Sequence, residues 1–152
     1  MLINLLCCLC VFVGGVMSSN KFDNIAQYFS LSVQIAVYEN GEKVVYEKGS
    51  KEYFEILYAV NEMTTDAHEL PAFGVSLDNE TREAIEQGVW LEFVFAETQC
   101  HNEMPFDSLL FEVKSEDSGF NLIRQYNGKY DGRCFYLNLQ GNMQLVEDLF
   151  LS

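Results

Sequence analysis

Apolar residues occupy every second position from Leu31 to Val37, which is the period of a β-strand with one buried face. Asn40-Gly41 follows this stretch, and the pair favours the positive φ angles of a type I′ turn. Residues 43–47 are again rich in β-branched and aromatic side chains. The pattern therefore predicts a β-hairpin.

A helical period replaces this alternation after Ser50. Apolar side chains recur three or four positions apart over residues 51–63, and Ser50 is a favourable N-cap. A second, shorter helix is expected at residues 79–87. Asp78 is expected to cap its start, and Gly88 to adopt the left-handed conformation that commonly follows a helix.

Further strands are expected at residues 70–77, 89–95, 108–114, 120–126 and 133–139. Alternation in the strand at 89–95 places Phe93 on one face and Trp90 and Glu92 on the other. A polar loop is expected at residues 96–106, and a terminal helix is expected to begin at an Asn142 cap.

The order of these elements predicts an α+β fold with a mainly antiparallel sheet of about six to seven strands. About two to three helices are expected to pack on one face, because the sheet must bury its apolar side. Residues 17–152 contain no linker-like or repeated segment. We therefore expect a single α+β domain over residues 17–152.

Residues 1–16 form an apolar leader that is too short to cross a membrane. One interpretation is a mis-assigned start, because Gly14-Gly15 can be encoded by a ribosome-binding sequence just before Met17. The protein would then begin at Met17 and be cytoplasmic. The alternative is a signal peptide and secretion, although the basic residue expected before the apolar region is missing. Neither interpretation predicts stable insertion into a membrane.

Negative charge is concentrated in one part of the chain. The formal net charge is −14, and 14 of the 23 acidic residues lie between Glu52 and Glu112, with Arg82 as the one basic residue. Such a surface repels nucleic acid and could attract a basic protein. Two alternatives are a solvated surface that only keeps the protein soluble, and mimicry of DNA phosphate, which would need regular rows of carboxylates. The side chains expected to bind this partner are Glu80, Glu83, Glu86, Trp90 and Glu92.

The predicted loop at 96–106 gathers the residues best suited to chemistry. Cys100 and His101 suggest a thiol-dependent enzyme, but adjacent side chains usually point apart, so His68 would have to serve as the base. Cys100, His101 and Cys134 are the alternative set of metal ligands. They lack the paired short spacing typical of zinc sites, and no cofactor is expected.

Arg124 and Arg133 lie near the ends of the last predicted hairpin. They could form a fork that binds an anion, or each could pair with a carboxylate of this acidic protein. The sequence contains no dinucleotide, P-loop, zinc-protease or serine-hydrolase motif. We therefore expect a non-catalytic protein-interaction or regulatory module, similar in kind to an immunity or antitoxin protein. The alternative is a small thiol- or metal-dependent enzyme that uses Cys100 and His101.

Overall fold

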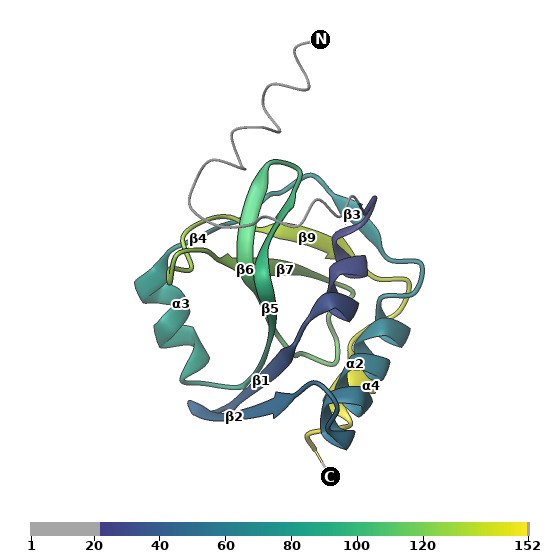
Figure 1. Ribbon diagram of the computed structural model, residues 1–152. Coiled ribbons are helices and arrows are strands. Elements are labelled where there is room, and N and C mark those ends of the chain that lie inside the picture. Colours follow the sequence, from purple (N-terminus) through teal and green to yellow (C-terminus); the bar gives the residue numbers. More distant parts are fainter. Residues whose placement is uncertain (1–21, 152) are drawn as a thin grey trace.

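The computed structural model describes residues 22–151, so the leader expected at residues 1–16 lies outside them. Seven strands form one antiparallel sheet in the order β2-β1-β5-β6-β7-β9-β3 (Figure 1). These strands are β1 Gln34–Glu39, β2 Glu42–Glu47, β3 His68–Leu70, β5 Val89–His101, β6 Met104–Glu112, β7 Gly119–Gln125 and β9 Phe135–Asn138. A separate small sheet pairs β4 Val75–Ser76 with β8 Gly132–Arg133.

The helices are the 3-10 helix η2 Ile25–Leu31, α2 Lys51–Met63, α3 Asp78–Ile85 and α4 Gln144–Glu147. The α+β class and the antiparallel sheet are thus confirmed. Three of these helices, η2, α2 and α4, contribute buried side chains to the same hydrophobic core. The short η2 was not predicted. None of the described helices is long and apolar enough to cross a membrane.

The main core lies between the sheet and η2, α2 and α4. It buries alternate residues of the central strands, including Ile35, Leu91 and Phe93, each with 0% exposed surface. The ring of Phe93 lies 4.6 Å from that of Phe29 in η2. The alternation that the sequence shows along these strands therefore points its apolar side at the helices.

The opposite face of the sheet carries a second, smaller core. Ile85 of α3 packs there with Trp90, Leu110 and Tyr130. Figure 1 shows α3 at the other side of the sheet from α2 and α4. Both faces of the central strands are therefore covered.

Two turns show how local sequence sets the strand pairing. Asn40 and Gly41 have φ angles of 49° and 86°, which confirms the predicted turn between β1 and β2. The loop predicted at residues 96–106 is wrong. β5 instead continues to His101 and turns at Asn102-Glu103, whose φ angles are 49° and 64°. Because the residues of this hairpin are mostly polar, the sequence pattern predicted a loop where the strands continue.

The predicted caps are confirmed at one helix and wrong at another. The Ser50 hydroxyl accepts a 3.2 Å bond from the Tyr53 amide, so α2 begins as predicted. Asp78 is instead the first residue of α3, and its carboxylate accepts the Tyr130 amide at 2.9 Å. Gly88 has a φ of 74°, as its place after α3 requires.

The remaining differences concern short elements. The strand predicted at 70–77 is divided into β3 and β4, which pair with different strands. Pro71 and Gly74 lie in the segment that separates them. The terminal helix α4 follows Asn142, whose side chain accepts the Gln144 amide at 3.0 Å, but it covers only residues 144–147.

Candidate functional site

Helix α3 presents three glutamates to solvent. Glu80, Glu83 and Glu86 are all exposed, and none of the ion pairs found among residues 22–151 includes any of them. Ile85 on the other side of the helix is buried in the second core. The helix is therefore anchored by one face while the opposite face carries unpaired negative charge.

Arg82 does not neutralise these glutamates. Its Nε lies 2.9 Å from Asp78 Oδ2, and its Nη2 donates to the Gly128 carbonyl at 2.9 Å. The guanidinium also lies over the ring of Tyr130, 5.1 Å from its centroid. The bond from Arg82 lowers the pKa of the Asp78 carboxyl and keeps it ionised. The one arginine of α3 is thus directed at the last hairpin.

The β1–β2 turn packs against the segment that follows α3. The Asn40 amide donates to the Gly88 carbonyl at 2.8 Å, and the Gly88 amide donates to Asn40 Oδ1 at 3.1 Å. A Cβ on Gly41 would lie 2.5 Å from Glu86 Oε2, so only glycine leaves Glu86 this position. We call the exposed set Glu80, Glu83 and Glu86 the acidic face.

The structure corrects two members of the predicted partner surface. Trp90 and Glu92 are only 6% and 3% exposed, so neither lies at a surface, and Trp90 packs with Ile85 of α3. The Trp90 indole donates to the Gln87 carbonyl at 2.9 Å. The physical reason for the correction is that α3 covers this face of β5, which the sequence pattern left open.

Glu92 is the centre of a buried polar cluster. Its carboxylate accepts hydroxyl bonds from Ser108 at 2.6 Å, Tyr38 at 2.8 Å and Tyr130 at 2.9 Å. Burial and the charge of Glu92 raise the pKa of both tyrosines above the ordinary value of 10.0. Three donors in place of a cation therefore satisfy this buried carboxylate.

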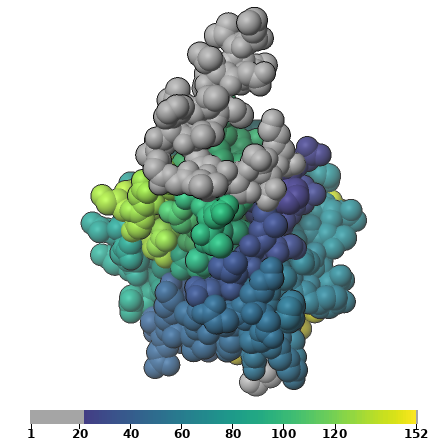
Figure 2. Space-filling view, in the orientation of Figure 1, coloured from purple at the N-terminus to yellow at the C-terminus, as the bar shows by residue number. Residues whose placement is uncertain are grey.

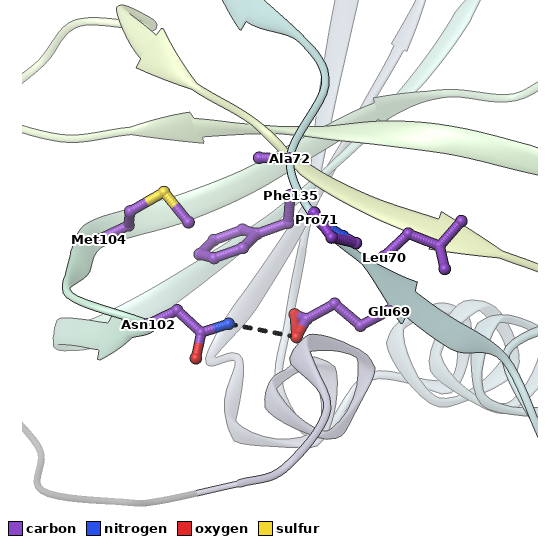
Figure 3. A pocket seen from close by; sticks show the side chains of 7 residues that line it. All are labelled: Glu69, Leu70, Pro71, Ala72, Asn102, Met104 and Phe135. Atoms are coloured by element: carbon purple, nitrogen blue, oxygen red, sulfur yellow. Dashed lines mark hydrogen bonds between the residues drawn. The ribbon is translucent and has the colours of Figure 1, made fainter.

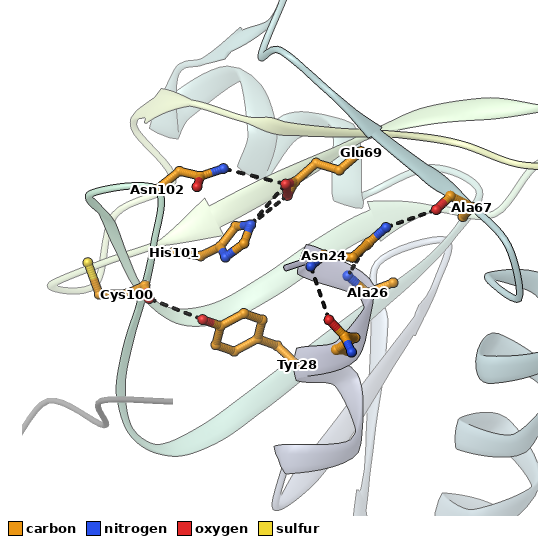
Figure 4. A network of polar contacts seen from close by, with 9 residues as sticks. Asn24, Ala26, Tyr28, Ala67, Glu69, Cys100, His101 and Asn102 are labelled. Atoms are coloured by element: carbon orange, nitrogen blue, oxygen red, sulfur yellow. Dashed lines mark hydrogen bonds and ion pairs between the residues drawn. The ribbon is translucent and has the colours of Figure 1, made fainter. Parts of the chain in front are cut away.

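His101 is paired with Glu69, a residue of the distant strand β3. Its Nε2 lies 2.8 Å from Glu69 Oε1, and the Asn102 amide donates to Glu69 Oε2 at 3.4 Å (Figure 4). The imidazole is 5% exposed and lies between the rings of Tyr28 and Phe135. Glu69 and His101 are 32 residues apart, so no local sequence signal reveals their pairing.

The predicted thiol site is not assembled. Cys100 and His101 are consecutive residues of β5, and Figure 4 shows the Cys100 sulfur pointing away from the imidazole. His68 precedes Glu69 in β3 and is exposed. Since neighbouring residues of a strand face opposite sides, the face of β3 that meets His101 is not the face that carries His68.

The metal alternative finds no support in the described part of the chain. No group of three or more His, Cys, Asp or Glu side chains within residues 22–151 could hold a metal ion. Cys134 is buried with a free thiol, and burial raises its pKa. The predicted ligands Cys100, His101 and Cys134 therefore do not form one site.

Arg124 binds backbone rather than a carboxylate or an open anion site. Its Nε donates to the Arg133 carbonyl at 2.7 Å and its Nη1 to the Pro105 carbonyl at 2.6 Å. Burial lowers the pKa of this guanidinium. Arg133 is exposed. An anion-binding fork would need the guanidinium groups of both Arg124 and Arg133 to be free. The Arg124 guanidinium is not free, because it already links the backbones of β6 and β8.

A pocket of about 280 Å³ lies beside the His101–Glu69 pair (Figure 3). It is lined by Glu69, Leu70, Pro71, Ala72, Asn102, Met104 and Phe135. Both oxygens of the one carboxylate in this lining already accept bonds from the protein. The lining contains no thiol, hydroxyl or amine that could act as a nucleophile.

Comparisons with known protein families, with curated proteins and with solved structures found no match. The geometry of the chain itself is therefore the basis for a functional proposal.

Proposed function

We propose that this protein is a non-catalytic interaction module that binds a basic protein through the acidic face. The observation that carries the proposal is the placement of Glu80, Glu83 and Glu86. They are exposed and form no ion pair within residues 22–151, and the helix that holds them is packed on a buried core. A fixed array of like charges attracts and orients an oppositely charged partner.

The energetics of α3 support a role for these charges outside folding. Glu80 and Glu83 are three positions apart on the helix, where like charges repel. Glu83 and Glu86 lie at the C-terminal end of α3, where the helix dipole disfavours negative side chains by about 0.3–1 kcal/mol each. Residues that cost stability are expected where function requires them.

The charge of the chain indicates the class of partner. A net charge of −14 disfavours nucleic acid and anionic surfaces, and a protein rich in lysine or arginine complements the acidic face. An immunity or antitoxin protein that blocks a basic effector is one class with this character. A thiol- or metal-dependent enzyme is the weaker candidate, because Cys100, His101 and Cys134 do not converge.

Affinity capture with two matched variants tests the proposal. Glu80→Lys/Glu83→Lys/Glu86→Lys reverses the acidic face, and Glu52→Lys/Glu55→Lys/Glu62→Lys makes the same change in net charge on exposed positions of α2. Wild type and the α2 variant should retain the same basic protein, and salt near 1 M should release it, since the screening length is then about 3 Å. The α3 variant should lose it.

Two results would reject the proposal. Wild-type protein that retains no basic protein at low salt would remove its main support. Equal loss of the partner from the α2 and α3 variants would mean that net charge alone, and not the acidic face, governs binding. Circular dichroism of each variant confirms that the fold is intact before capture is compared.

A further inference from the structure

Strand β2 forms one edge of the seven-stranded sheet and pairs only with β1 among the described strands. The Lys48 amide donates to the Val33 carbonyl at 2.9 Å. Alternate residues of an antiparallel strand direct their backbone N–H and C=O groups to the same side. The backbone groups of Val44 and Tyr46 therefore also point to β1. The backbone N–H and C=O groups of Lys43 and Val45 and the N–H of Glu47 therefore point outward, away from the sheet. The Glu47 carbonyl accepts bonds from the Ser50 amide at 3.0 Å and the Ser50 hydroxyl at 2.9 Å.

The two valines of β2 also remain largely uncovered. Val44 and Val45 are 49% and 42% exposed. In Figure 2 the blue residues near positions 40–50 form the lower border of the molecule. An edge strand with outward backbone groups and exposed valines is a template for pairing with another strand.

The charges of this segment have a symmetry that selects the partner strand. The order Glu42-Lys43-Val44-Val45-Tyr46-Glu47-Lys48 reads as acid, base, three uncharged residues, acid, base. When the strand is turned antiparallel to itself about Val45, each lysine falls opposite a glutamate. We propose that β2 pairs with β2 of a second copy of this chain, with Val45 opposite Val45.

Backbone geometry and charge agree on this register. Outward-facing residues must pair with outward-facing residues, so the allowed registers differ by two positions along the partner. With Val45 opposite Val45, Lys43 lies opposite Glu47 of the second copy, and the Glu47 N–H can donate to the Lys43 carbonyl. A shift to either neighbouring register would place Val45 opposite Lys43 or Glu47 and leave the charges unmatched.

Within one protomer these charges are available for such pairing. Among residues 22–151, no ion pair includes Glu42, Lys43, Glu47 or Lys48. Glu47 accepts a 2.7 Å bond from the Gln34 amide, and the Lys43 ammonium lies 5.4 Å from the centre of the Tyr38 ring. The segment carries as many lysines as glutamates, although the chain is strongly acidic. This inference does not rest on the acidic face.

Charge exchange in β2 tests the inference through the oligomeric state of the full chain. Sedimentation velocity of wild type up to about 200 µM should show dimers, because one strand pair is a small interface and binds weakly. Lys43→Glu/Lys48→Glu should be monomeric at the same concentrations, and so should Glu42→Lys/Glu47→Lys. An equal mixture of the two variants should restore the dimer.

A further variant and a control test whether the charge pattern of β2, and not net charge alone, restores the dimer. Glu42→Lys/Lys43→Glu/Glu47→Lys/Lys48→Glu exchanges all four charges, keeps the symmetry, and should dimerise like wild type. Glu80→Lys/Glu83→Lys has the net charge of Glu42→Lys/Glu47→Lys but an unchanged β2. It should not form a heterodimer with Lys43→Glu/Lys48→Glu.

Two outcomes would overturn the inference. A wild type that remains monomeric at every concentration has no β2 pairing. A dimer that survives both charge variants uses another surface. A variant that loses its circular dichroism signal is replaced by Val45→Thr/Val44→Thr, which keeps the fold and should weaken the dimer by removing apolar contact at its centre.

Discussion

The two faces of β5 are buried in different ways. On one face Phe93 lies in an apolar core closed by η2, α2 and α4, and on the other Glu92 is buried and accepts three hydroxyl bonds. Glu92 and Phe93 are nevertheless consecutive residues of β5. The comparison teaches that alternation identifies which residues share a face, whereas the burial of that face depends on elements distant in sequence.

Removal of the buried Phe93 ring should have the largest effect on stability. Phe93 is 0% exposed, and its ring lies 4.6 Å from Phe29 and 6.2 Å from Phe111. Phe93→Ala should lower the free energy of unfolding by about 4 kcal/mol, from lost burial and the cavity left behind. Urea denaturation measures the change. A loss below about 1 kcal/mol would mean that this core is not closed around Phe93.

Removal of the buried Glu92 carboxylate should lower stability nearly as much. Glu92→Ala leaves the hydroxyls of Tyr38, Ser108 and Tyr130 without their acceptor, so the free energy of unfolding should fall by about 3 kcal/mol. Glu97→Ala, at an exposed position of the same strand, is the control and should change it by less than about 0.5 kcal/mol. Equal effects at the two positions would contradict the burial of Glu92.

The tyrosines of this cluster should make the second face sensitive to alkaline pH. Burial and the Glu92 charge raise the pKa of Tyr38 and Tyr130 in the folded state above 10.0. Their contribution is therefore fully present below pH 10 and is lost as pH rises above it, because the unfolded chain ionises first.

Two tyrosine substitutions and a control measure this dependence. Tyr130→Phe should lower the free energy of unfolding at pH 7 by about 1–2 kcal/mol, since one donor to Glu92 is lost. Tyr38→Phe/Tyr130→Phe should also flatten the decline of stability above pH 10. Tyr58→Phe, at a side chain that is 66% exposed, should leave the decline unchanged. An equally steep decline in the double variant would contradict the raised pKa values.

Local signals in the sequence were sufficient for part of the fold. The β1–β2 turn depends on Asn40 and Gly41 themselves, and the start of α2 depends on Ser50. The period of apolar residues predicted α2 and the central strands. These features could be predicted because each is decided by residues close together in the chain.

Other features depend on contacts between distant residues. Asp78 has the composition of a cap, but the Tyr130 amide and Arg82 take its carboxylate. The hairpin at Asn102-Glu103 is polar and was therefore predicted as part of a loop. Glu92 has the composition of a surface residue and is buried because three hydroxyls reach it from other strands and a loop. Sequence pattern alone carries no information on such partners.

The candidate site was predicted in part. Glu80, Glu83 and Glu86 are exposed, as a partner surface requires, whereas Trp90 and Glu92 are buried. Binding of a basic protein at this face stays a prediction.

A paired measurement of stability and capture tests the acidic face most directly. Glu83→Lys/Glu86→Lys places positive charge at the C-terminal end of α3. It should raise the free energy of unfolding by about 0.5–1 kcal/mol, because the helix dipole favours this charge, and it should abolish capture of the basic partner. Glu52→Lys, in the first turn of α2, should lower stability and leave capture intact. If the α3 variant captures the partner as wild type does, the acidic face is not the binding surface.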